Sequence, residues 1–109
     1  MSISLIISNP STDEQRLVNI PVATEDAFQK IWQTGCSELS LRYVSLFDTG
    51  VEIEQNNVGE LIAELTILHH WAETLKPQTE QIAQMQTRLK RLIDEIPEIV
   101  DEKTKVYIG

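Results

Sequence analysis

The chain has 109 residues, of which 41 % are hydrophobic and 24 % are charged, a composition that excludes global disorder. A single cysteine, Cys36, excludes an intramolecular disulfide and a cysteine-based zinc cluster. No apolar run approaches the roughly 18 residues that a membrane helix needs, and no secretory leader is recognisable. We therefore expect one soluble, cytoplasmic domain over residues 1–109.

The net charge of −8 comes from 17 acidic and 9 basic residues, and much of the acidic excess is local. Between residues 38 and 73 there are seven acids against one base, Arg42. Such a field repels phosphate backbones and anionic lipids, so neither nucleic acid nor a membrane is an expected partner. It attracts a basic protein, although acidity can also serve solubility alone. The acids are Glu38, Asp48, Glu52, Glu54, Glu60, Glu64 and Glu73.

The N-terminal part of the chain predicts two strands. Residues 2–8 are a β-branched apolar run that ends at Asn9 and Pro10, which is typical of a strand followed by a turn. After a polar loop, residues 16–22 predict a second strand, and Pro21 within it favours the edge or end of a sheet.

A short amphipathic helix is predicted next, over residues 25–34. Thr24 precedes two acids, which favours a helix start there. Phe28 and Trp32 recur at helical spacing and should pack on the core. Gly35 is the expected left-handed cap at the C-terminal end.

Residues 39–47 and 51–54 alternate in polarity, and both predict strands. The triplet between them, Asp48-Thr49-Gly50, resembles the catalytic triplet of aspartic proteases. A retroviral-type protease also needs a glycine-rich flap and a nearly all-β fold, whereas this chain lacks the flap and its residues 58–96 are helical in pattern. We therefore interpret the triplet as the turn of a β-hairpin.

Two longer helices follow, one over about 58–75 and one from about Gln78 to Pro97, and they predict an antiparallel helical hairpin. Residues 105–109 predict a last strand. The expected order is β-β-α-β-β-α-α-β. The simplest packing is an α+β domain, in which the helical hairpin and the short helix cover one face of a small, mainly antiparallel sheet.

The first long helix carries a second apolar stripe, formed by Ala63, Ile67 and Trp71, beside its core face. Glu60 and Glu64 lie next to this stripe. Two interpretations remain open: the stripe packs against the second long helix, or it faces a partner, with Trp71 as an anchor and the glutamates selecting a basic surface.

Residues that could carry chemistry are few. His69 and His70 are adjacent on a helix and point about 100° apart, so they cannot easily share a metal ion, and Glu73 adds only one further ligand. Nothing in the sequence supplies a base for the Cys36 thiol. We expect no catalytic residue, no metal and no cofactor.

The function expected from these observations is that of a small acidic, non-enzymatic binding protein. A concrete version is an inhibitor or immunity-type protein that neutralises a basic bacterial toxin such as a nuclease. The alternative is a self-associating structural or regulatory domain, for which a homodimer would be typical, and an enzyme ranks third. The residues predicted to contact a partner are Asp48, Glu52, Glu54, Glu60, Glu64, Ile67 and Trp71.

Overall fold

In the computed structural model of the protein, which describes residues 2–109, four strands form one antiparallel sheet in the order β2-β1-β4-β3. The first and last strands of the chain therefore lie side by side in the centre of the sheet, with Leu5 opposite Ile108. The strands are β1 (Ser2–Ile7), β2 (Ile20–Thr24), β3 (Val51–Ile53) and β4 (Val106–Ile108).

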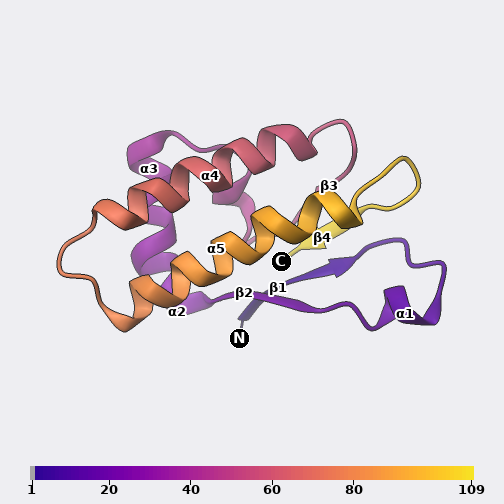
Figure 1. The fold of residues 1–109 in the computed structure, drawn as a ribbon, viewed down its shortest axis with the longest axis horizontal. Helices are drawn as coiled ribbons and strands as arrows, with labels where there is room; N and C mark the ends of the chain where they lie inside the picture. The colour runs from indigo at the N-terminus through magenta and orange to yellow at the C-terminus, as the bar shows by residue number, and fades with distance from the viewer. Residues whose placement is uncertain (1) are drawn as a thin grey trace.

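The helices cover only one face of this sheet (Figure 1). In β1, Ile3, Leu5 and Ile7 are buried beneath the helices, because alternate residues of a strand point to the same face. Ile6 and Tyr107 pair on the opposite face and are 41 % and 39 % exposed. The predicted α+β fold, with a mainly antiparallel sheet covered on one face by helices, is confirmed.

The predicted helical hairpin is also confirmed, as α4 (Val58–Thr74) and α5 (Glu80–Ile99), which pack against each other. Thr79 caps α5, since its hydroxyl accepts a hydrogen bond from the Ile82 amide at 3.2 Å. An end or a kink of this helix was predicted at Pro97, and α5 continues two residues beyond it, to Ile99. Pro97 lies in the last turn, which the Val100 amide closes onto the Ile96 carbonyl.

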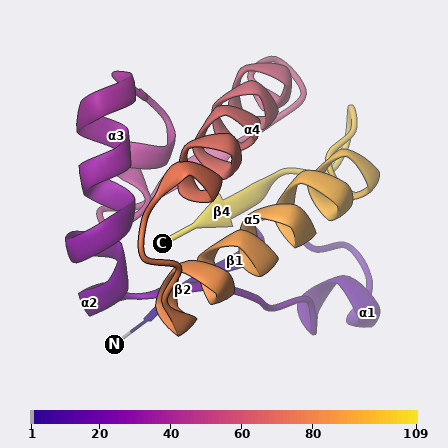
Figure 2. The same ribbon diagram turned by 60° about the vertical axis from the view of Figure 1, so that its left-hand side comes forward.

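A second helical segment stands beside α4 (Figure 2) and consists of α2 (Glu25–Ala27), the π-helical η1 (Phe28–Trp32) and α3 (Gln33–Leu39). It begins at the predicted residue, because the Thr24 hydroxyl accepts a hydrogen bond from the Ala27 amide. Gly35 was predicted to be the C-terminal cap of this helix, and that prediction is wrong, because Gly35 lies buried within α3. Ser40 caps the helix instead, with a left-handed backbone of φ 57°.

Gly35 is needed for the close packing of α3 on α4. A Cβ at this position would lie 2.6 Å from Leu68 Cδ1 and 2.8 Å from two ring carbons of Trp71. A helix with any larger residue here could not approach α4 as closely. The glycine is therefore explained by a helix–helix contact rather than by a turn.

The predicted strand over 39–47 is wrong, and with it the hairpin. The apolar residues Leu41, Val44 and Phe47 are buried three positions apart, which is the spacing of a 3₁₀-helix, and η2 (Val44–Leu46) lies between them. The triplet from Asp48 to Gly50 is indeed a turn, and Gly50 has a φ of 101°. It connects η2 to β3, which pairs with β4.

The polar loop after β1 also contains a short helix that the sequence analysis missed, α1 (Asp13–Arg16). Thr12 caps it by accepting a hydrogen bond from the Gln15 amide at 3.1 Å. This helix lies beside β1, at the opposite end of the sheet from the connection between α4 and α5 (Figure 1).

Candidate functional site

The flank of α4 that faces α3 and η2 carries four of the predicted partner-binding residues, Glu60, Glu64, Ile67 and Trp71. They recur at three- and four-residue spacing, which places them on one side of the helix. Of the two interpretations of the apolar stripe, packing against α5 is wrong for its largest members. Trp71 packs on α3, and Ile67 is 47 % exposed.

Trp71 is held at the edge of this flank by α3. Its indole Nε1 donates a hydrogen bond to Glu38 Oε2 at 2.6 Å, and its ring lies over Gly35. The side chain remains half-buried, with part of its ring open to solvent. A hydrogen-bonded, half-buried tryptophan beside a carboxylate presents apolar area in a fixed orientation.

Glu64 makes structural contacts that the sequence analysis did not predict. Its carboxylate accepts hydrogen bonds from three consecutive backbone amides, those of Arg42, Tyr43 and Val44, at distances between 2.9 and 3.2 Å. These amides lie just before η2 and at its first residue, and they have no strand to pair with. Glu64 therefore fixes the loop after α3 on the surface of α4 and is a structural residue.

Tyr43 and Arg42 extend the same surface beyond α4. Hydrogen bonding to the Glu60 carboxylate, more than desolvation, raises the pKa of the Tyr43 hydroxyl. The Arg42 guanidinium carbon lies 5.5 Å from the centre of the Tyr43 ring, within cation–π range. We call the surface formed by Glu38, Tyr43, Glu60, Ile67 and Trp71 the α3–α4 surface.

The remaining predicted residues lie elsewhere. Asp48, in the turn after η2, accepts a hydrogen bond from the Gln29 side chain at 2.8 Å. Glu52 lies on β3 next to Tyr107, on the uncovered face of the sheet. Glu54 follows β3 and pairs with Lys105 at 3.5 Å. The structure thus divides the predicted site into an α4 group and a β3 group.

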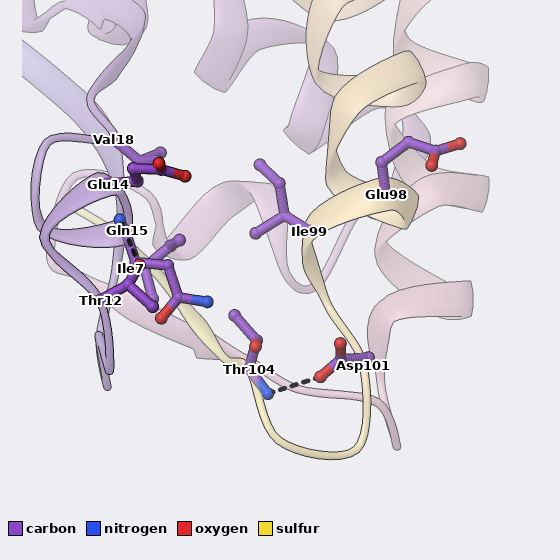
Figure 3. A pocket seen from close by; sticks show the side chains of 9 residues that line it. All are labelled: Ile7, Thr12, Glu14, Gln15, Val18, Glu98, Ile99, Asp101 and Thr104. Carbon is purple, nitrogen blue, oxygen red and sulfur yellow. Dashed lines mark hydrogen bonds between the residues drawn. The ribbon is translucent and has the colours of Figure 1, made fainter.

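A pocket of about 460 Å³ opens between the segment around α1 and the end of α5 (Figure 3). Ile7, Val18 and Ile99 contribute apolar surface, and the acids Glu14, Glu98 and Asp101 line it without any basic side chain. Asp101 already accepts hydrogen bonds from the amides of Lys103 and Thr104, both at 2.8 Å, and these bonds lower its pKa. Its carboxylate is therefore part of a loop structure. The other lining residues are Thr12, Gln15 and Thr104.

The groups that could carry chemistry are engaged or inert. Burial, with smaller contributions from the carboxylates of Glu64 and Asp48, raises the pKa of the Cys36 thiol to about 12. His69 and His70 both approach one Glu73 oxygen, at 3.0 and 3.7 Å. Within residues 2–109 no group of three or more His, Cys, Asp or Glu side chains could hold a metal ion.

Comparison with known proteins assigns no family, since no family model, curated protein or solved structure matches the chain. Over residues 2–109, no helix has both the length and the apolar character required to cross a bilayer. Any functional conclusion therefore rests on the geometry of the surface itself.

Sequence reasoning missed Glu38 and Tyr43 as members of the site. Glu38 is 33 positions from Trp71 in the chain, and only the packing of α3 on α4 brings them together. One signal was available: a glycine in the middle of a helical pattern often marks a close helix–helix contact. Gly35, interpreted in that way, would have pointed to α3 as the neighbour of Trp71.

Proposed function

We propose that this protein is a small acidic binding protein, without enzymatic activity, that holds a basic protein partner on its α3–α4 surface. The class that fits best is an inhibitor or immunity-type protein directed at a cationic toxin such as a nuclease. The observation that carries the proposal is the position of Trp71 and Ile67 beside the carboxylates of Glu38 and Glu60.

The composition of this surface is that of a protein-binding site. Tryptophan, tyrosine and arginine are the residues most enriched among those that dominate binding energy. Trp71 and Tyr43 belong to this surface, Arg42 adjoins it at the Tyr43 ring, and Ile67 adds exposed aliphatic area. Their neighbouring glutamates would speed the encounter with a basic protein, because complementary charge acts mainly on the association rate.

The residues that suggested chemistry support a binding role rather than catalysis. The Cys36 thiol stays protonated at neutral pH because its pKa is raised to about 12. Asp48, the carboxylate of the protease-like triplet, is bonded to Gln29 on the adjacent helix.

Self-association is the second candidate, and one observation favours it. Ile6 and Tyr107 are neighbours on the uncovered face of the sheet, where a second copy could pack. Glu52 also lies on this face, so two acidic copies would have to bring like charges together. Repulsion between these like charges thus favours a basic partner over a second copy.

The test is affinity purification at low ionic strength with the intact protein as bait, followed by binding kinetics with the captured partner. A basic protein that is released by moderate salt is expected. Glu60→Lys should slow its association by about tenfold at low salt, and Trp71→Ala should speed its dissociation. The matched control is Glu14→Lys on α1, which makes the same charge change away from the surface.

Two results would overturn the proposal. One is an association rate that Glu60→Lys and Glu14→Lys change equally. The other is a protein that captures only copies of itself and elutes as a dimer in size-exclusion chromatography with light scattering.

A further inference from the structure

A groove of about 330 Å³ runs between the helical segment 30–38 and the connection from α4 to α5. Figure 2 shows these two parts of the chain side by side. The groove shares Glu38 and Trp71 with the α3–α4 surface and continues it toward the start of α5. Its apolar lining comes from Ile31, Trp71, Leu75, Pro77 and Ile82.

Opposite charges lie at the two ends of this groove. Lys30, Thr34 and Glu38 line one wall and are spaced four residues apart, so they follow one face of the helical segment. Eight residues at about 1.5 Å each put Lys30 and Glu38 roughly 12 Å apart along the axis. The groove therefore has a cationic end, an apolar middle and an anionic end.

The opposite wall contributes one further charged residue, Lys76. α3 and α4 run antiparallel, since Glu38 meets Trp71 while Arg42 meets Glu64. Leu75 and Lys76 follow the C-terminal end of α4 at Thr74, and the antiparallel arrangement places that end of α4 toward Lys30. Lys30 pairs with Asp26 at 3.2 Å, which leaves the Lys76 ammonium as the main attraction for an anion at that end.

We propose that this groove binds an extended segment of the protein partner in which a basic, an apolar and an acidic residue occupy positions i, i+2 and i+4. In an extended chain these three side chains point to the same face and span about 13 Å at roughly 3.3 Å per residue, close to the roughly 12 Å that separates Lys30 from Glu38 along one wall. The basic side chain meets Glu38, the apolar one contacts Trp71 and Leu75, and the acidic one meets Lys76.

This inference rests on the proposed function and deepens it, because it names the chemistry of the segment that docks. The acidic residues of the α3–α4 surface select a basic partner in general. The groove adds a requirement that net charge alone would not impose, namely one acidic residue at a fixed distance from a basic one. A peptide that carries only basic residues is disfavoured by Lys76.

The experiment titrates capped pentapeptides into the isolated protein and follows amide and indole signals by two-dimensional NMR. The probe is Lys-Ser-Leu-Ser-Glu, and the comparison peptides are Lys-Ser-Leu-Ser-Lys, Glu-Ser-Leu-Ser-Glu and Lys-Ser-Ser-Ser-Glu. Trp71 reports on the groove, and Trp32, which is 1 % exposed, serves as the internal control. A dissociation constant on the order of 1 mM is expected for one buried leucine and two exposed ion pairs.

Each comparison peptide should bind several-fold more weakly than the probe, the one without leucine weakest of all. Lys76→Glu should reverse the preference, so that the peptide with two lysines binds more tightly than the probe. Glu38→Gln should weaken the probe two- to fivefold while its side-chain oxygen still accepts the Trp71 indole hydrogen bond.

The groove proposal is wrong if the Trp71 indole signal does not move at 10 mM probe peptide, which is about ten times the expected Kd. Equal binding of the four peptides, or a preference unchanged by Lys76→Glu, would also exclude it. None of these results depends on the captured partner. If the partner still associates more slowly with the Glu60→Lys variant, the proposed function stands and only the groove's role is rejected.

Discussion

Replacing Glu64 with alanine tests the assignment of this residue to the fold rather than to the partner. The substitution removes the acceptor of three backbone amides, those of Arg42, Tyr43 and Val44. No other partner for these amides lies within the loop. The matched control is Glu60→Ala, one turn earlier on α4, whose carboxylate bonds a side chain and no backbone amide.

The expected loss of folding stability depends on how far each of the three amides is buried. A hydrogen bond to a charged group contributes about 1.5–3 kcal/mol, and a buried amide without a partner costs about 1–3 kcal/mol. The amides of Tyr43 and Val44 are part-buried, whereas water can replace Glu64 at the exposed Arg42 amide. We therefore expect Glu64→Ala to lower the free energy of unfolding by about 2–4 kcal/mol, and Glu64→Gln by less, since one oxygen remains. Glu60→Ala should cost under ~1 kcal/mol.

Urea unfolding followed by far-ultraviolet circular dichroism measures these differences, because the midpoint falls while the slope stays constant if only stability changes. The reasoning is refuted if Glu64→Ala and Glu60→Ala have the same midpoint. It is also refuted if Glu64→Ala lowers partner affinity while the free energy of unfolding stays that of the unchanged protein.

Three further outcomes follow from the contacts. Gly35→Ala should displace the Trp71 ring and so change the fluorescence of Trp71. The added methyl group overpacks the contact at a cost of about 1–3 kcal/mol, which exceeds the roughly 1 kcal/mol gained in helix propensity. An unchanged fluorescence spectrum would contradict this expectation. Cys36 should not react with a thiol reagent at pH 8 until urea unfolds the protein, since a pKa of about 12 leaves almost no thiolate; rapid modification of the folded protein would show that the thiol is accessible. The lowered pKa of Asp101 stabilises the folded loop above the ordinary carboxyl pKa, and this contribution disappears as the pH falls through the lowered value. The protection factors of the Lys103 and Thr104 amides, which compare their exchange with the intrinsic rate at each pH, should therefore fall below about pH 4, and Asp101→Asn should remove most of that dependence.

Much of the fold could be predicted from local patterns. Alternation in β1 and the 3.6-residue period of α4 and α5 report burial on one side, which is a property of each element by itself. Thr24 marks a helix start through its own hydroxyl, which accepts a hydrogen bond from an amide only three residues along the chain. These patterns can be interpreted without knowing which residues pack on the other side of the core.

What only the tertiary structure decided depends on contacts between distant residues. Residues 39–47 alternate like a strand, yet their buried members also fit the three-residue period of a 3₁₀-helix. The choice between these is made by Glu64, which binds the backbone amides from more than twenty positions away on α4. In the same way Trp71 could be recognised as an exposed-stripe residue, but its neighbours, Gly35 and Glu38, are set by the packing of α3 on α4. A local pattern records how polar each residue is, and it contains no information on which carboxylate or ring the folded chain brings against it.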